Sequence, residues 1–116
     1  MTTTATIANT LIRLCKEGKF IEAQKECYDD QIISIEPDGS KTIGLANMNA
    51  KEQKFLDSIE KINSIDFSDP LIAGNYFSAK LAMEIDFKNG IHRHIEEICI
   101  YKVAGDKIVF EQFFRD

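Results

Sequence analysis

Two turn signals near the C-terminal end constrain the fold of this chain more than any other feature. Asn89-Gly90 and the run Ala104-Gly105-Asp106-Lys107 each lie between segments in which apolar and polar residues alternate. Asn-Gly in this setting favours a two-residue hairpin, because both central residues of the preferred turn need positive φ. Residues 72–115 are therefore predicted to form three antiparallel strands.

The rest of the chain mixes helical and short extended segments. In order, the predicted elements are a helix that ends near Gly18, a short helix over 20–27, a short strand over 32–36, a helix over 46–62 and a brief strand over 65–67. Helices that precede a long antiparallel meander favour a curved sheet wrapped around the helices. Such an architecture commonly encloses a pocket.

The tight turn at Asn89-Gly90 also predicts which side chains share a face of the sheet. In that register Phe87 lies opposite His92, and across the second turn Ile98 lies opposite Phe113. One largely apolar face then carries five polar residues, namely His92, His94, Glu96, Glu111 and Arg115. We assign this face to the concave side that the helices cover. A β-bulge in these long strands would invert part of the assignment.

The size and charge of the chain limit what it can bind. With 116 residues, the chain suits a single domain over residues 1–116. Its net charge is −5 at pH 7, and it has no cluster of Lys or Arg. Because the field of such a protein repels phosphate backbones and anionic lipid, we expect neither nucleic acid nor a membrane as a partner.

The cysteines and the N-terminal segment predict a reducing compartment. Cys15, Cys27 and Cys99 are an odd number without CxxC spacing, so we expect reduced thiols. No basic residue precedes the first apolar stretch, and no uninterrupted apolar run approaches the ~18 residues of a membrane span. We therefore expect a soluble protein of the cytoplasm.

The order of the predicted elements is similar to that of the nuclear transport factor 2-like superfamily. Three stretches resemble bacterial SnoaL-like proteins: Ile33-Ser34-Ile35-Glu36-Pro37, residues 70–74, and residues 96–101 followed by 106–109 and 111–114. The resemblance covers the whole chain. It implies an α+β fold, a cystatin-like cone in which N-terminal helices pack in a curved, mainly antiparallel sheet. The superfamily includes ketosteroid isomerases, polyketide cyclases, dehydratases and transport factors, so its fold does not choose a function.

The same resemblance implies two candidate catalytic carboxyl groups. In the ketosteroid isomerases a general-base carboxylate precedes a proline at the end of the first strand, and Glu36-Pro37 matches that placement. A second acidic group of those enzymes corresponds to Glu96 or Glu97 here. Leu11 stands where the isomerases use a phenol on the first helix, so steroid isomerisation is not expected.

Each candidate also has a simpler interpretation. Glu36 is a solvated turn residue if it points outward, and a general base if it points with Ile32 and Ser34 into an apolar cone, where burial favours its protonated form. Glu96 is a proton donor to an oxyanion in a dry pocket, or one half of a cross-strand ion pair with Arg115. The sequence leaves both alternatives open.

A metal site has only partial support. His92 and His94 project to one side of their strand, as two ligands of a metal would, and Glu96 continues the row. A third ligand from another element is not evident, and no glycine-rich phosphate loop or nucleophile motif is present. We therefore expect neither a metal nor a cofactor.

Taken together, these features predict a single internal pocket that binds a small, mostly apolar molecule. The predicted ligand-binding residues are Leu11, Phe55, Phe77, Met83, His94, Ile98 and Glu111, with Glu36 and Glu96 as the candidate catalytic pair. One alternative is an isomerase, cyclase or dehydratase in which Glu36 is the base and Glu96 the acid. Another is a dimerisation module without catalysis.

The outward face of the predicted sheet also favours self-association. It gathers five apolar residues, namely Tyr101, Val103, Ile108, Phe110 and Phe114. A small soluble monomer rarely exposes so large an apolar patch. We therefore expect a homodimer through the convex face of the sheet.

Overall fold

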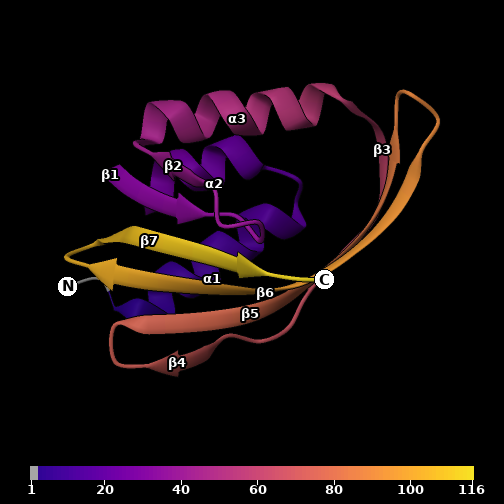
Figure 1. Cartoon of the computed structure of the whole chain (residues 1–116). Coiled ribbons are helices and arrows are strands. Elements are labelled where there is room, and N and C mark those ends of the chain that lie inside the picture. The colour runs from indigo at the N-terminus through magenta and orange to yellow at the C-terminus, as the bar shows by residue number, and fades with distance from the viewer. Residues whose placement is uncertain (1–2) are drawn as a thin grey trace.

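Three helices cover the concave face of a curved seven-stranded sheet in the computed structural model, which describes residues 3–116 (Figure 1). The helices are α1 (Thr4–Lys16), α2 (Phe20–Cys27) and α3 (Leu45–Asp57). The strands are β1 (Tyr28–Ile35), β2 (Lys41–Ile43), β3 (Ile59–Phe67), β4 (Leu71–Ala73), β5 (Tyr76–Phe87), β6 (His92–Ala104) and β7 (Lys107–Phe114). The α+β architecture implied by the sequence is confirmed.

The sheet has the strand order β2-β1-β7-β6-β5-β3, with the short β4 paired to β5. Strands β1 and β7 are parallel, and every other pairing in the described residues is antiparallel. The β5–β6 hairpin curls towards the end of α3 (Figure 1), where the ring centroids of Phe55 and Phe87 lie 6.1 Å apart. No helix of the described chain is both long and apolar enough to cross a membrane.

Helix α1 is defined by a cap at each end. The hydroxyl of Thr3 accepts a hydrogen bond from the backbone N–H of Thr6 at 3.1 Å, which satisfies one of the free donors at the helix N-terminus. At the other end Gly18 has φ of 77°, and the N–H of Lys19 donates to the carbonyl of Leu14 at 2.9 Å. Between the caps, one stripe of the helix is buried against α2 and the sheet: Ile7, Ala8, Leu11, Ile12, Leu14 and Cys15.

The prediction of a helix over 46–62 is wrong at its C-terminal end. Helix α3 ends at Asp57, and the nine-residue strand β3 begins at Ile59. Two register shifts interrupt the pairing of β3 with β5, between Ile59 and Lys61 and between Ile62 and Ser64. Each shift adds a residue, so isoleucines three positions apart all point to the concave face. In the sequence, this spacing of three residues resembles the apolar stripe of a helix.

The predicted register of the β5–β6 hairpin is wrong by one residue. Asp86, not Phe87, lies opposite His92, because the loop comprises the three residues 88–90. The N–H of Phe87 donates to the carbonyl of Ile91 at 2.8 Å, which closes this loop. Only Gly90 within the loop has positive φ, at 89°, as in a three-residue hairpin that ends in a left-handed glycine.

This shift reverses the two faces of β6. The helix-covered face carries Ile95, Glu97, Cys99, Tyr101 and Val103, whereas the open face carries His92, His94, Glu96, Ile98 and Ile100. A bulge between Lys102 and Val103 shifts the pairing of β6 with β7, so Glu111 lies opposite Tyr101. Glu111 is therefore on the concave face, as predicted.

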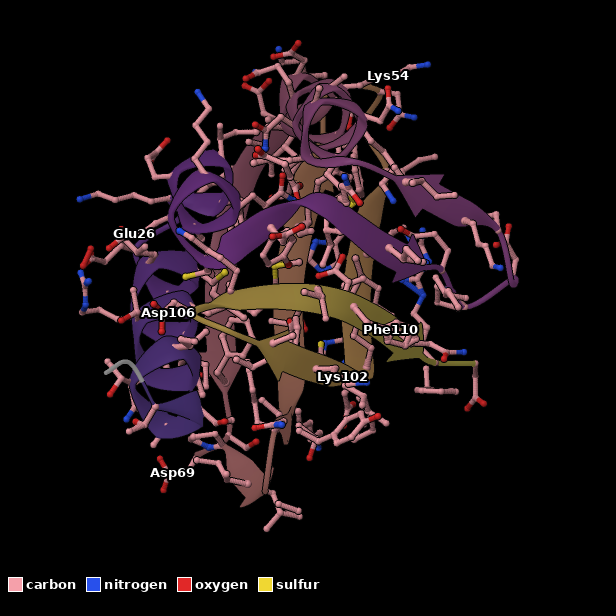
Figure 2. The ribbon with its side chains drawn as sticks, turned by 90° about the vertical axis from the view of Figure 1, so that its left-hand side faces the viewer. Glu26, Lys54, Asp69, Lys102, Asp106 and Phe110 are labelled. Carbon is pink, nitrogen blue, oxygen red and sulfur yellow. The ribbon has the colours of Figure 1, made fainter. Side chains whose placement is uncertain are left out.

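The structure also corrects the predicted outward patch. Tyr101, Val103 and Ile108 are buried beneath the helices rather than exposed. Phe110 and Phe114 do lie on the convex face, and Figure 2 shows Phe110 and Lys102 on the side of the sheet away from α1.

The hairpin register can be tested by two matched substitutions on β6. Ile95 is 7% exposed and Ile98 is 45% exposed. We expect Ile95→Ala to lower the free energy of unfolding by about 2–4 kcal/mol, because it leaves a cavity in the core, and Ile98→Ala by under about 1 kcal/mol. Urea unfolding at low protein concentration measures both. The reverse order of losses would support the register of a two-residue turn instead.

Candidate functional site

A cavity of about 300 Å³ lies between the three helices and the concave face of the sheet. Its wall contains aromatic residues from both layers, namely Phe20, Tyr28, Phe55, Phe67, Tyr101 and Phe113. Leu11 from α1 and Met83 from β5 contribute aliphatic surface, as does Met48 from α3. The wall also carries four carboxyl groups and two cationic side chains: Glu36, Glu52, Glu97, Glu111, Lys51 and Arg115.

Glu111 is the most deeply buried of these carboxyl groups. Its side chain is 2% exposed and accepts hydrogen bonds from the hydroxyls of Tyr28 and Ser34, the latter at 2.6 Å. The parallel pairing of β1 with β7 places Ser34 beside Glu111. Burial raises the pKa of Glu111 to about 7, although the two hydroxyl donors favour the charged form. This carboxyl group therefore exchanges its proton near neutral pH.

Glu52 is a second carboxyl group with a raised pKa. It lies on α3, and its Oε1 accepts a hydrogen bond from Nε2 of Gln24 on α2 at 3.1 Å. Asn49 holds Gln24 in place, because its Nδ2 donates to the Gln24 Oε1 at 2.7 Å. Burial raises the pKa of Glu52 to about 7, and the charge of nearby Lys51 opposes this shift.

Two ion pairs occupy the more exposed part of the wall. Nζ of Lys51 lies 2.5 Å from Oε1 of Glu36, and NH1 of Arg115 lies 3.4 Å from Oε2 of Glu97. Burial raises the pKa of Glu97, and Arg115 counteracts that effect. Both cations of the wall are therefore already bound to carboxylates.

Five of the predicted site residues line the cavity: Leu11, Glu36, Phe55, Met83 and Glu111. Phe77 does not reach it, because this residue is buried behind the wall and stacks on Tyr101 with 4.6 Å between ring centroids. Of the two candidates left open on β6, Glu97 and not Glu96 faces the cavity.

Three predicted site residues lie on the opposite side of the sheet. His94, Glu96 and Ile98 were expected in the pocket, but the one-residue shift of the hairpin places them on the convex face. The predicted catalytic pair of Glu36 and Glu96 is therefore not assembled. The cross-strand pair of Glu96 with Arg115 is also wrong, because Glu96 contacts Lys80 at 2.6 Å and His94 at 3.1 Å.

Glu36 does not meet the condition of burial in an apolar cone. Its side chain is 34% exposed and bound to Lys51 of α3. Helix α3 runs close enough to the end of β1 for this contact. Glu36 is thus a residue of the cavity rim with a cationic partner.

Sequence reasoning missed Glu52 and the two tyrosines of the wall. A signal for Glu52 exists, because Met48, Glu52 and Phe55 are four and three residues apart and so share one face of a helix. Tyr28 was not among the predicted pocket residues, and Tyr101 had been placed on the outer face of the sheet.

The two histidines form a separate cluster on the convex face. His92 contacts Asp86 and Glu84, both at 2.6 Å, and His94 contacts Glu84 at 2.5 Å. Hydrogen bonds to these carboxylates raise the pKa of His92, and those to Glu96 and Glu84 raise the pKa of His94. Within residues 3–116, no group of three or more His, Cys, Asp or Glu side chains is placed to hold a metal ion.

The raised pKa of Glu111 predicts how stability depends on pH. The folded protein holds this proton up to about pH 7, whereas the ordinary value is 4.5, so the stabilising contribution is complete below pH 4.5 and is lost as pH rises through 7. Between pH 5 and pH 8 we expect the wild type to lose on the order of 2 kcal/mol more unfolding free energy than Glu111→Gln, which cannot titrate.

Urea unfolding at the two pH values measures this difference. Glu60→Gln, at an exposed position of β3, is the matched control and should keep the wild-type dependence. Equal losses in the wild type and in Glu111→Gln would show that Glu111 is ionised throughout this range.

Comparisons with known proteins agree on the fold. A SnoaL-like protein from Mesorhizobium loti, whose name suggests a polyketide cyclase, shares 24% identity and a TM-score of 0.88, over 98% of this chain and 100% of its own. A nuclear transport factor 2-like protein of unknown function from Burkholderia pseudomallei shares 10% identity and a TM-score of 0.84, over 100% of this chain and 92% of its own.

An uncharacterised cystatin-fold protein from Novosphingobium aromaticivorans shares 13% identity and a TM-score of 0.83, over 99% of this chain and 100% of its own. No curated protein sequence matches the chain. The sequence model of the SnoaL-like domain matches residues 1–115, as the resemblance of the sequence implied. The chain therefore belongs to the family of SnoaL-like domains.

Proposed function

We propose that this SnoaL-like domain binds a small, mostly apolar molecule in the cavity between its helices and its sheet. The observation that carries the proposal is the cavity itself, about 300 Å³ with a largely aromatic and aliphatic wall. An engineered apolar cavity of roughly 150 Å³ holds a benzene ring, so this volume suits a molecule of one or two rings. A lining rich in apolar and aromatic side chains is typical of ligand pockets.

The proposal is limited to binding and does not include turnover. The acid–base chemistry expected from the sequence needs Glu36 and Glu96 together against the substrate. Glu96 is on the far side of the sheet, and Glu36 is held by Lys51 at 2.5 Å. These contacts favour a binding role for the site.

A reducing compartment such as the cytoplasm suits the three buried free thiols.

Filling part of the cavity should weaken binding without unfolding the protein. Ala23 on α2 is completely buried and lines the cavity, so Ala23→Leu places three more carbons inside it. With indole as a neutral two-ring probe, we expect the dissociation constant to rise roughly tenfold or more, because contacts worth about 1.4 kcal/mol or more are lost. NMR of the methyl groups of Met48 and Met83, which line the cavity, measures binding.

Ala50→Leu is the matched control, since Ala50 is an exposed residue of α3. This variant should bind indole as the wild type does. Equal affinity of Ala23→Leu and Ala50→Leu, or no response of the two methionine methyl groups to indole in the wild type, would contradict the proposal.

We also propose that the convex face of the sheet forms a homodimer. Ile33, Ile98 and Phe114 are 38%, 45% and 46% exposed on neighbouring strands of this face. Ile100 and Phe110 lie beside them and are partly exposed. A two-fold axis would place this patch against its own copy, with Lys80 and Glu96 at its border.

Sedimentation velocity tests the dimer. We expect the wild type to sediment as a dimer at micromolar concentration and Ile98→Glu as a folded monomer, because the substitution buries an unpaired charge in each half of the interface. Ile91→Glu, at a residue that is 53% exposed in the hairpin, should remain dimeric. A monomeric wild type would rule out the dimer.

A further inference from the structure

We propose that the ligand of the cavity is a cation, with a positively charged amine group on an apolar body of one or two rings. This inference rests on the proposed function, because it names the chemical class of the molecule that the cavity binds.

The first argument is the charge balance of the wall. Of its four carboxyl groups, Glu36 is paired with Lys51 and Glu97 with Arg115. Glu52 and Glu111 are hydrogen-bonded to neutral groups and have no cation within ion-pair distance in the described chain. Each carboxylate oxygen has two lone pairs, so both groups can still accept a further partner. A bound cation would supply the charge that the wall lacks.

The second argument is the aromatic part of the wall. Tyr101 is 5% exposed and lines the cavity, and one face of its ring is stacked on Phe77. Phe113 meets the same ring edge-on, with 6.5 Å between centroids. Aromatic faces attract ammonium groups, most strongly where water is excluded. An anion would be repelled by the negative aromatic faces and by the two carboxyl groups. Both cations of the wall are already paired with carboxylates, so neither is free to bind it.

The groups around the two carboxyls set the pH at which this site becomes charged. Tyr28 and Ser34 of β1 donate to Glu111, while Lys51 and Glu52 of α3 act on it through their charges. Lys51, Glu36 and Glu97 act on Glu52, and Gln24 donates to it. Burial outweighs these effects and leaves both pKa values at about 7. A cation would favour the ionised forms, so its binding releases protons and strengthens as pH rises.

Three probes of one size and different charge test the proposal. Benzyltrimethylammonium keeps its charge at every pH, neopentylbenzene is its neutral isostere, and 3-phenylpropionate is an anion. At pH 8 we expect the cation to bind at least tenfold more tightly than the neutral isostere, and the anion to bind most weakly. Shifts of the Met48 and Met83 methyl groups report binding in the cavity.

The pH dependence gives a second readout. Between pH 6 and pH 8 a group of pKa 7 goes from about one-tenth to about nine-tenths ionised, so the affinity for the cation should rise up to roughly tenfold for each carboxyl group involved. Glu111→Gln and Glu52→Gln should each reduce this rise. Glu96→Gln removes the same charge from the convex face and should leave the affinity for the cation at pH 8 unchanged.

The outcomes separate the two proposals. If the neutral isostere binds as tightly as the cation, and neither Gln variant changes the affinity, the cavity is a binding site but the inference of a cationic ligand is wrong. If none of the three probes, and not indole either, shifts the methyl groups, the proposed binding function itself fails.

Discussion

The three-residue loop at 88–90 sets the register of the β5–β6 hairpin, and the composition of the cavity depends on that register. Side chains alternate along β6, so a shift of one residue exchanges the set facing the helices for the set facing outward. The observed register buries Ile95, Cys99 and Tyr101 and turns Glu97 to the cavity. It leaves both histidines and Glu96 outside, which removes them from any chemistry in the pocket.

The polar part of the cavity depends on two junctions between elements. The parallel pairing of β1 with β7 brings the hydroxyls of Tyr28 and Ser34 to Glu111, and these donors offset part of the cost of burying a carboxyl group. Helix α3 forms the other junction, because it carries Lys51 to Glu36 and Glu52 to Gln24. The result is an apolar chamber with paired charges at its rim and two uncompensated carboxyl groups deeper inside.

Bulges determine the shape of the sheet around this chamber. Those in β3 keep Ile59, Ile62 and Ile65 on the concave face, opposite Phe87, Ile85 and Met83 of β5. The bulge at Lys102 and Val103 aligns Glu111 with Tyr101. A sheet without these extra residues would place several of the same side chains on the wrong side, so the curvature and the lining of the cavity have a common origin.

The sequence by itself determined the class of fold, the first two helices, the existence of the long hairpins and several residues of the cavity, including Leu11 and Met83. Local periodicity predicts these features, and no contact with a distant part of the chain changes the face on which these residues lie. Tertiary structure decided the face of β6 and the end of α3. Both alternating sets of β6 contain apolar residues, Ile98 and Ile100 in one and Ile95 and Cys99 in the other. Hydropathy therefore could not choose between them. Only the loop geometry and the pairing with β5 and β7 could decide which set of β6 side chains faces the helices.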